Sequence, residues 1–355
     1  MELSKKRSRT EMEDNNSNSR TTTPLLKTRQ VAIKKQDPIT IDQVWVHGGC
    51  PDGMGAATVA YLYGQTQEDE KTFEFKYLFH GSAMPSGKDK HIVIFDFCPK
   101  KEELEVLLQE CKSIGIYDHH KSAFPVMDDF PEICTYDNDH SGVGLAWSFF
   151  FPKYPTPPLW VSYIEDRDLW RFKYGEKTKQ LAAFLYYNGH EMNPESWFYA
   201  LYKESLEDAG LEFSSFVKDV TDNDFIWTLE DSDEILEKGA AMLKVQDSIV
   251  SRRSKYVKKA TFCGIPCAVS NDNEFVSEIC NAILEKHQDI KLVLSWRMDH
   301  INDSYCFSMR SREKDKEISC GVICAKFGGG GHDQAAAFKL PGIDTNLVEF
   351  LAKNL

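Results

Sequence analysis

From Gln43 onward, the hydrophobic and polar positions follow two alternating patterns. Short runs of β-branched and aromatic residues, typical of buried strands, alternate with segments in which apolar residues recur at helical spacing. The predicted strands are residues 43–46, 91–95 and 113–117, and the predicted helices are residues 55–63 and 101–110. Strands and helices that alternate in this way favour a parallel α/β sheet with helices on its faces.

The pattern changes twice further along the chain. Residues 157–170 predict a helix, and residues 175–255 read as mostly helical with exposed acidic faces, so they are interpreted as a connector. The last hundred residues return to a mixed α/β pattern, with predicted strands at 267–270, 291–295 and 305–309 and a helix at 276–287. We therefore expect an N-terminal α/β domain at 38–174, a helical connector at 175–255 and a smaller mixed α/β domain at 256–355.

The first 37 residues have few large apolar side chains and predict a disordered tail. The basic run Lys5 to Arg9 indicates either a nuclear address or an ordinary solvated tail. The chain contains no apolar run of the length that a membrane span needs, and its N-terminus is polar, unlike a secretory signal. The expected location is intracellular and cytoplasmic, with the nucleus as the alternative, and no membrane partner is expected.

The charge balance narrows the choice of partner. The net charge of the 355-residue chain is −13, and the tail carries nine Lys and Arg against five Asp and Glu, so the rest is more acidic still. This balance argues against a protein that coats long nucleic acid by neutralising many phosphates. Ten cysteines are scattered through the chain, and the pairs Cys263/Cys267 and Cys320/Cys324 depart from the usual zinc spacing, so reduced thiols are expected.

Three predicted strands are each followed by a residue that can bind metal or substrate: His47, Asp96 and Asp118. Parallel strands joined by right-handed crossovers place their carboxyl ends at one edge of the sheet, where ligand sites form. A single Asp after a strand is more often a helix cap or a turn residue. Three such strand ends together indicate a site.

The residue types at these strand ends suit a divalent metal. His47 and Asp52, with Asp96 and Asp118, supply the mixed imidazole and carboxylate ligands expected for Mn²⁺ or a similar ion. The run Asp118-His119-His120 places three titratable groups directly after an apolar strand, which is costly unless a cation or substrate satisfies them. The sequence therefore predicts a metal site that activates water against a phosphate ester.

A second motif near the C-terminus is the glycine run before His332. Gly328, Gly329, Gly330 and Gly331 predict a loop whose backbone N–H groups face an anion, with His332 as a further donor. A flexible linker is the alternative, which the core-like flanking sequence disfavours. Arg310 and Arg312 follow a predicted strand and are candidates to meet phosphate, although Arg310 could equally pair with an acid.

The Asp-His-His tripeptide and the Gly-Gly-Gly-Gly-His run together resemble the signatures of the DHH phosphoesterases that carry a DHHA1 domain, across about residues 42–350. This superfamily includes RecJ-type exonucleases and nanoRNA or cyclic-dinucleotide-product hydrolases. The resemblance implies that 38–174 is the catalytic DHH domain and 256–355 a substrate-binding DHHA1 domain.

The resemblance also implies a role for each matching residue. Ligands of a binuclear Mn²⁺ centre, with Mg²⁺ or Co²⁺ as alternatives, would be His47, Asp52, Asp96, Asp118, His119 and Asp166. The implied catalytic residues are Asp118, His119, His120 and His332. Substrate would contact Ser141, Gly142, Gly328, Gly329, Gly330, Gly331 and His332, and Arg310 joins this set as a candidate from its place after a predicted strand.

The chain departs from the family pattern at Met54, where many relatives have a second Asp that serves a metal. A thioether is a poor ligand for Mn²⁺. A subset of the superfamily with a Cys-Pro-Asp-Gly first motif resembles this chain in that respect. The occupancy of a second metal position therefore stays open, as does the choice between Asp166 and Asp168 for the fourth acid.

The function implied by the resemblance is metal-dependent hydrolysis of short single-stranded oligonucleotides to mononucleotides. One alternative is a phosphatase or phosphodiesterase for 3′-phosphoadenosine 5′-phosphate or a linear dinucleotide. The other is a weakened, nucleotide-binding regulatory homologue. The sequence leaves open the choice of RNA or DNA, the substrate length, the polarity of attack and the oligomeric state.

Overall fold

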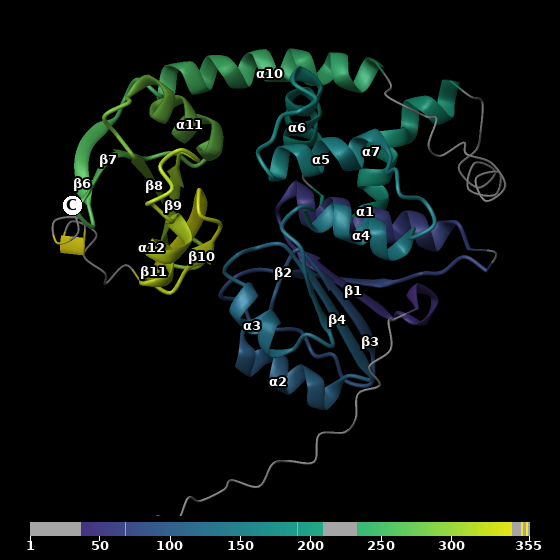
Figure 1. The fold of residues 1–355 in the computed structure, drawn as a ribbon. Helices are drawn as coiled ribbons and strands as arrows, with labels where there is room; N and C mark the ends of the chain where they lie inside the picture. The colour runs from purple at the N-terminus through teal and green to yellow at the C-terminus, as the bar shows by residue number, and fades with distance from the viewer. Residues whose placement is uncertain are drawn as a thin grey trace, which may run out of the picture.

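The computed structural model describes residues 37–67, 69–189, 191–208, 233–342, 349–350 and 353. The predicted disordered tail, apart from residue 37, the basic run Lys5 to Arg9 and the middle of the predicted connector lie outside the described residues. Figure 1 shows two sheet-containing parts, with the long helix α10 (Asp233–Arg253) running from the helices above the first sheet toward the second.

The first part is built on a five-stranded sheet in which every pairing is parallel. Its strand order is β2-β1-β3-β4-β5. The strands are β1 (Gln43–His47), β2 (Glu74–Leu78), β3 (His91–Phe95), β4 (Ser113–Asp118) and β5 (Cys134–Tyr136). The predicted parallel sheet is therefore confirmed, and the three predicted strands form its centre.

Helices cover both faces of this sheet, and the side chains alternate between them. Val44 and Phe95 point to a core shared with α1 (Pro51–Gln65), α4 (Gly142–Phe150) and α5 (Leu159–Asp168). Trp45 and Ile94 point to a second core under α2 (Lys101–Glu110) and α3 (Phe124–Asp129). This alternation follows from the two-residue period of a strand, and burial on both faces explains why the central strands are almost wholly apolar.

Part of the predicted connector packs against the first sheet's helices. Phe198 of α7 (Pro194–Asp208) and Leu236 of α10 are buried in the same core as Val44. Helix α6 (Glu176–Asn188) lies along α5 and α10. These helices extend the first hydrophobic core, and α10 runs on to the second part, which Tyr186 and Tyr187 of α6 also contact at Phe275. The boundary at residues 174 and 175 stays a prediction.

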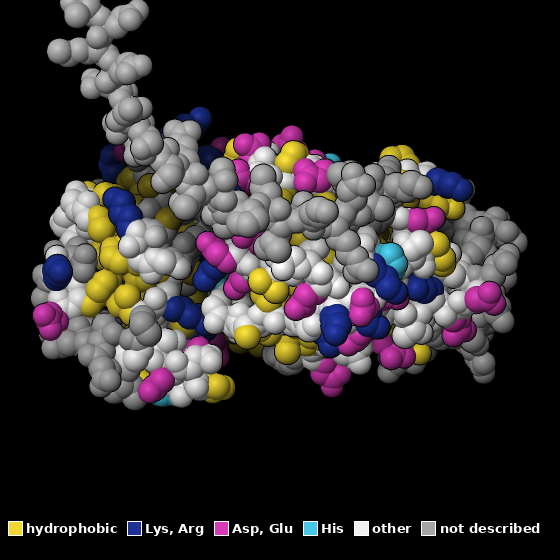
Figure 2. Space-filling view, turned by 90° about the horizontal axis from the view of Figure 1, so that it is seen from below, with side chains coloured by type: hydrophobic (Ala, Val, Ile, Leu, Met, Phe, Trp, Pro, Cys, Tyr) yellow, Lys and Arg dark blue, Asp and Glu magenta, His cyan; other side chains and the backbone are white. Residues whose placement is uncertain are grey.

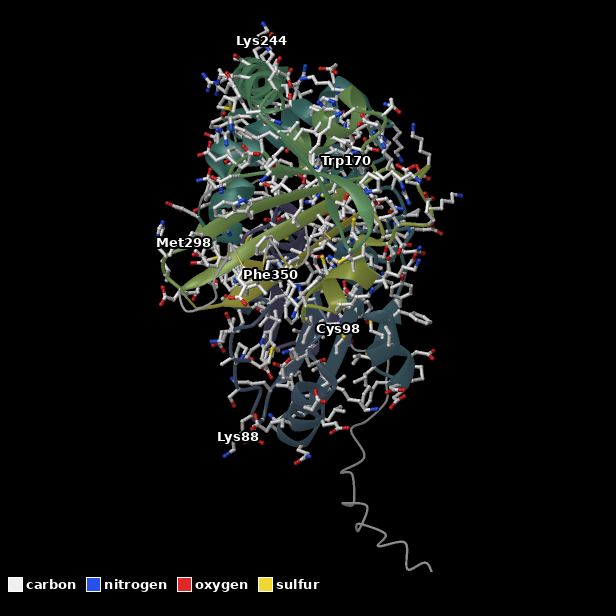
Figure 3. All side chains as sticks on the ribbon, turned by 90° about the vertical axis from the view of Figure 1, so that its left-hand side faces the viewer. Lys88, Cys98, Trp170, Lys244, Met298 and Phe350 are labelled. Atoms are coloured by element: carbon white, nitrogen blue, oxygen red, sulfur yellow. The ribbon has the colours of Figure 1, made fainter. Side chains whose placement is uncertain are left out.

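The second part has a six-stranded sheet of order β10-β11-β9-β8-β7-β6, in which only β7 and β8 pair in parallel. Its strands are β6 (Lys258–Phe262), β7 (Ile265–Ser270), β8 (Leu292–Asp299), β9 (Ser304–Ser311), β10 (Gly330–Gly331) and β11 (Ala335–Pro341). Helix α11 (Val276–Lys286) covers one face and α12 (Cys320–Ala325) the other. The mixed α/β character expected of the C-terminal part is confirmed. Figure 3 views this sheet with α10 at the top, beside Lys244.

Among the residues that the structure describes, no helix has both the length and the apolar character needed to cross a membrane. On the face shown in Figure 2, acidic and basic side chains of the described residues are interspersed, without a broad basic area.

Candidate metal centre

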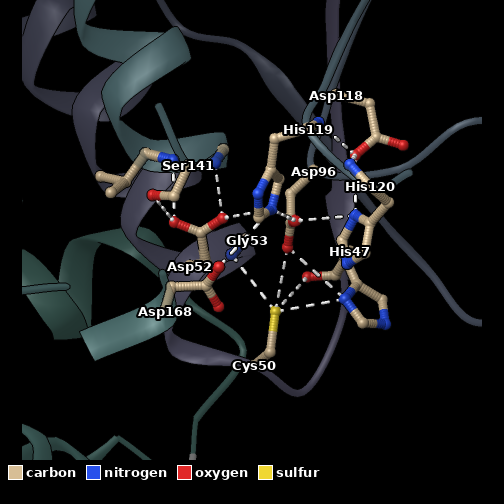
Figure 4. Close-up of polar contacts among 12 residues, drawn as sticks. His47, Cys50, Asp52, Gly53, Asp96, Asp118, His119, His120, Ser141 and Asp168 are labelled. Atoms are coloured by element: carbon tan, nitrogen blue, oxygen red, sulfur yellow. Dashed lines mark hydrogen bonds and ion pairs between the residues drawn. The ribbon is translucent and has the colours of Figure 1, made fainter. Parts of the chain in front are cut away.

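Three neighbouring strands bring their terminal residues to one edge of the first sheet. His47 ends β1, Asp96 follows β3 and Asp118 ends β4, and these strands are adjacent in the sheet. Asp96 adopts a left-handed backbone conformation, with φ of +57°, which turns the chain sharply after the strand. Its carboxylate Oδ2 then lies 3.5 Å from the Nδ1 of His47. The expectation that these strand ends meet is confirmed, as Figure 4 shows.

Asp52 reaches the same cluster from the first turn of α1. The helix starts directly against β1, because Gly53 has no side chain: a Cβ there would lie 2.1 Å from the carbonyl oxygen of His47. The Asp52 carboxylate is buried, and its Oδ2 lies 3.6 Å from the Nε2 of His119.

His119 stands at the centre of the carboxylates. Its Nε2 lies 3.1 Å from Asp96 Oδ1 and 3.5 Å from Asp168 Oδ2, in addition to its contact with Asp52. Burial alone would lower the pKa of His119, but the hydrogen bond with Asp96 and the charges of Asp168 and Asp52 raise it to about 10. Without metal, this imidazole is therefore protonated and neutralises part of the acidic charge around it.

Asp166 and Asp168, the two candidates for the fourth acid, have carboxylates in different surroundings. Asp166 is buried outside the cluster, where it accepts hydrogen bonds from the backbone N–H groups of Lys173 and Tyr174 and from the hydroxyl of Thr178. The sequence favoured Asp166 as the metal-binding acid, but its oxygens hold the turn after α5. Asp168, the alternative, lies against His119.

Asp96 joins two groups of ligand atoms. Its Oδ1 faces His119 and lies 3.7 Å from the Nδ1 of His120, while its Oδ2 faces His47 and accepts a 3.1 Å hydrogen bond from the thiol of Cys50. Sequence reasoning missed Cys50 as a member of the site. Its position three residues after the histidine that ends β1 is the signal that could have found it.

Asp118 arranges the tripeptide locally. Its Oδ1 accepts hydrogen bonds from the backbone N–H groups of His119 and His120 and lies 2.8 Å from the Nδ1 of His120. Burial alone would lower the pKa of His120, but the negative charge of Asp118 raises it to about 9. Burial alone would raise the pKa of Asp118, and the charge and hydrogen bond of His120 hold it below its usual value.

The electrostatics of the cluster suit a cation. Burial raises the pKa of Asp52 well above its usual value, and the charges of Asp96 and Asp168 raise it further, because several carboxylates crowd one buried space. Among the described residues, the buried Nδ1 of His119 has no hydrogen-bond partner. Imidazole and carboxylate atoms lie within 4.8 Å of one another in groups that include Asp52, His119 and Asp168, and Asp96, Asp118, His119 and His120. The residues present therefore fit a divalent metal ion.

Ser141 and Gly142, expected to face substrate, lie behind Asp52. Ser141 is fully buried, and its hydroxyl donates a 2.5 Å hydrogen bond to the Asp52 carboxylate. The backbone N–H groups of Gly142 and Val143 donate to the same carboxylate at 2.6 Å and 3.0 Å. The N-terminus of α4 thus holds Asp52, which occupies the donors that a substrate phosphate would need.

Met54 does not face the cluster. Its side chain is buried in the core under α1, so its sulfur does not lie among the ligand atoms of the cluster. Residue 54 therefore supplies no metal ligand.

The glycine run also differs from the expected anion loop. Gly330 and Gly331 form the edge strand β10 against β11, and the backbone N–H groups of Gly328 and Gly329 donate to carbonyls at the end of α12. The N–H of His332 donates to Ala335. A Cβ at Gly329 would lie 2.0 Å from the carbonyl of Ala337, so the missing side chain allows close packing of the backbone. These N–H groups are occupied within the protein and do not form an open row of donors.

The glycine run nevertheless places His332 beside the cluster at the edge of the first sheet. The His332 ring stacks on His120 with centroids 4.6 Å apart and lies 5.0 Å from the His119 ring. Two contacts beside it join the parts: Lys121 pairs with Asp333, and the N–H of Gly331 donates to the hydroxyl of Ser122 at 3.2 Å. Residues 328–332 therefore belong to the site through His332.

The two arginines lie elsewhere. Arg310 donates to the hydroxyl of Ser277 and to the carbonyl of Met309, within the second part. Arg312 donates to the carbonyls of Leu284, His287 and Ile290 around the end of α11, where it caps the helix. Neither arginine contacts the cluster.

No family model matches this chain. An uncharacterized protein of Acanthamoeba polyphaga mimivirus is 25% identical over 325 residues, which cover 85% of this chain and 68% of that protein. Among solved structures, a pGpG-specific phosphodiesterase from Vibrio cholerae is 13% identical with a TM-score of 0.42, covering 88% of this chain and 97% of that one. RecJ from Thermus thermophilus in complex with Mn²⁺ is 14% identical with a TM-score of 0.41, covering 92% and 55%.

Proposed function

We propose that this chain is a DHH-type phosphoesterase that uses divalent metal to hydrolyse short single-stranded oligonucleotides to mononucleotides. The observation that carries the proposal is the arrangement of Asp96 and His119. Asp96 presents one oxygen to each of two ligand groups, and His119 lies among three carboxylates. A set of this kind, at the carboxyl edge of a parallel sheet, is suited to hold one or two ions of the Mn²⁺, Mg²⁺ or Co²⁺ type.

The residues divide into two roles. We assign metal binding to His47, Asp52, Asp96, Asp118, His119 and Asp168. A bound divalent ion would neutralise charge on the phosphate oxygens and lower the pKa of an attacking water. Water adds to phosphorus, the phosphorus–oxygen bond to the next nucleotide breaks, and the released oxygen takes up a proton.

His120 and His332 are proposed to contact the phosphate from the open side of the cluster. Burial lowers the pKa of His332 to about 3, and the charges of His120 and His119 act in the same direction. A neutral His332 donates a hydrogen bond to a phosphate oxygen without adding a charge that would repel the metal.

A short substrate agrees with the surface. The chain carries a net charge of −13, and Lys121, the basic residue beside the tripeptide, is paired with Asp333. Few cations are therefore available to follow a long phosphate backbone. Lys121 and Ser122 contact Asp333 and Gly331 of the second part directly beside the histidines, which favours a compact substrate. A linear dinucleotide or 3′-phosphoadenosine 5′-phosphate is therefore the second candidate.

The test is a substrate panel with purified protein and Mn²⁺, Mg²⁺ or Co²⁺. The panel contains 5′-labelled di- to pentanucleotides of RNA and DNA, a linear dinucleotide and 3′-phosphoadenosine 5′-phosphate. We expect mononucleotide products from the oligomers. Faster turnover of the small nucleotides would favour the second candidate, and no product with any metal would contradict the proposed activity.

Single-residue variants test whether turnover depends on the residues of the cluster. Asp118→Ala and His119→Ala should abolish turnover, whereas His300→Ala, which removes an exposed histidine of the second part, should leave it unchanged. A His119→Ala variant with the wild-type rate would contradict the metal assignment.

A further inference from the structure

The thiol of Cys50 is a ligand-type group of the cluster to which the proposed function gives no role. Its Sγ lies 3.2 Å from the Nδ1 of His47 and 3.1 Å from the Oδ2 of Asp96. The third side of this triangle, from His47 Nδ1 to Asp96 Oδ2, is 3.5 Å. Figure 4 shows the three side chains converging from β1, the start of α1 and the end of β3.

The size of the triangle matches a set of atoms around one ion. Metal–nitrogen and metal–oxygen bonds of about 2.1 Å and a metal–sulfur bond of about 2.3 Å place neighbouring ligand atoms roughly 3.0 to 3.6 Å apart, depending on the coordination geometry. All three sides lie within that range. The same three residues offer one nitrogen, one sulfur and one oxygen within 4.8 Å of one another.

Helix capping alone does not account for a sulfur at this position. The N–H of Gly53 donates to the Cys50 Sγ at 3.3 Å, so the residue caps α1. Ser, Thr, Asp and Asn cap helices better than Cys, because their oxygens accept hydrogen bonds more strongly. Burial and the charges of Asp96 and Asp52 raise the pKa of Cys50 in the metal-free protein, so a metal ion would have to displace the thiol proton in order to bind the thiolate.

The position of Met54 gives Cys50 a further significance. Met54 is turned into the core, so the residue two positions after Asp52 brings no ligand to the site. Cys50 stands two positions before Asp52 and does reach the site, on the side of His47. A sulfur from Cys50 therefore lies among the ligand-type atoms of the cluster, whereas position 54 supplies none.

We propose that Cys50 binds a divalent ion as a thiolate, together with His47 and Asp96, and that this gives the His47 side of the cluster a preference for Zn²⁺ or Co²⁺ over Mn²⁺ and Mg²⁺. The inference rests on the proposed function, because it assumes that the cluster holds metal. On binding, the thiol loses its proton to solvent and a sulfur–metal bond forms, without any change of oxidation state. Sulfur ligands select for softer ions, whereas carboxylates alone suit Mn²⁺ and Mg²⁺.

The test is a titration of metal-free protein with Co²⁺, followed by optical absorption. Visible d–d bands report that Co²⁺ binds, and a sulfur-to-cobalt charge-transfer band in the near ultraviolet reports a thiolate ligand. Wild type should show both. Cys50→Ser, which retains a good capping residue, should lose the charge-transfer band and keep visible bands. Cys263→Ser is the matched control, because Cys263 is exposed and far from the cluster in the chain, and it should keep both.

The outcomes separate this inference from the function on which it rests. Visible bands without a charge-transfer band in wild type overturn the role of Cys50 and leave the metal centre standing. A charge-transfer band that persists in Cys50→Ser also overturns it, since another thiol would then be the ligand. Absence of any Co²⁺ band, with no metal by elemental analysis, overturns the proposed metal centre itself. As a second measurement, Cys50→Asp should lower the ratio of Zn²⁺ to Mn²⁺ affinity by about tenfold or more, and an unchanged ratio contradicts the inference.

Discussion

Replacing Ser141 by alanine tests whether the N-terminus of α4 holds Asp52 in its metal-binding form. The hydroxyl of Ser141 is fully buried and donates to the Asp52 carboxylate at 2.5 Å, alongside the N–H groups of Gly142 and Val143. The substitution removes one of these three donors. A hydrogen bond to a charged group contributes about 1.5 to 3 kcal/mol, and a group that supports a metal ligand typically affects metal affinity by about 10- to 100-fold.

The expected result depends on whether metal is bound. Burial and the charges of Asp96 and Asp168 raise the pKa of Asp52, while the hydrogen bond from Ser141 lowers it, so the hydroxyl stabilises the ionised form. Ser141→Ala should therefore weaken Mn²⁺ binding by about 10- to 100-fold. At saturating metal the melting temperature should fall by about 2 to 4 °C per kcal/mol lost, and without metal it should fall less.

Isothermal titration calorimetry and thermal melting, each with and without Mn²⁺, measure the two effects. Ser270→Ala is the matched control: Ser270 is also a buried serine, but among the described residues its hydroxyl has no hydrogen-bond partner. We expect the control to change neither affinity nor melting temperature appreciably. A Ser141→Ala protein that binds Mn²⁺ as tightly as the control would refute the reasoning.

Three further predictions follow from the site. Asp168→Asn should lower metal affinity about tenfold or more with little loss of stability. Asp166→Asn should instead lower the melting temperature, because that carboxylate accepts three hydrogen bonds in the turn after α5. Calorimetry and thermal melting measure the two effects, and the reverse result would show that Asp166 is the ligand. The raised pKa of His119 (about 10) means that it is protonated at neutral pH in the metal-free protein, and a ligand must be neutral, so metal binding releases a proton and strengthens as the pH rises toward this value. Calorimetry in buffers of different ionisation enthalpy measures that release, and its absence near pH 7 contradicts the sign. His332→Ala should leave metal content unchanged by elemental analysis while lowering kcat/KM, and loss of metal would show that His332 is a ligand.

The central strands could be predicted from the sequence because their residues are buried on both faces. His91–Phe95 matches the prediction in both bounds, and its apolar run leaves no competing interpretation. Glu74–Leu78 and Cys134–Tyr136 were not predicted, because the first is a partly exposed edge strand with polar residues and the second is only three residues long. In the second sheet, the alanines of β11 have low strand propensity, and their pairing with β9 decides their structure.

The site shows the same division between local and tertiary information. His47, Asp96 and Asp118 could be found because strand direction alone brings them to one edge. The choice between Asp166 and Asp168 could not, because two residues two apart on a helix point to different sides, and only the packing of α5 decides which side faces His119. The bonding of residues 328–331 likewise depends on strand pairing, which the glycine pattern does not encode.

The contacts of Lys121 and Ser122 with the second part link the position of that part to the Asp118-His119-His120 tripeptide. These two residues follow His120 directly in the chain, so the segment that carries the imidazoles is also the surface on which the second sheet closes. Separating the two parts by a few ångströms breaks both contacts and removes His332 from the rings of His119 and His120 at the same time. Any separation of the two parts at this place would therefore also take His332 away from His119 and His120, and salt, which screens the Lys121–Asp333 pair, would weaken this contact between the parts.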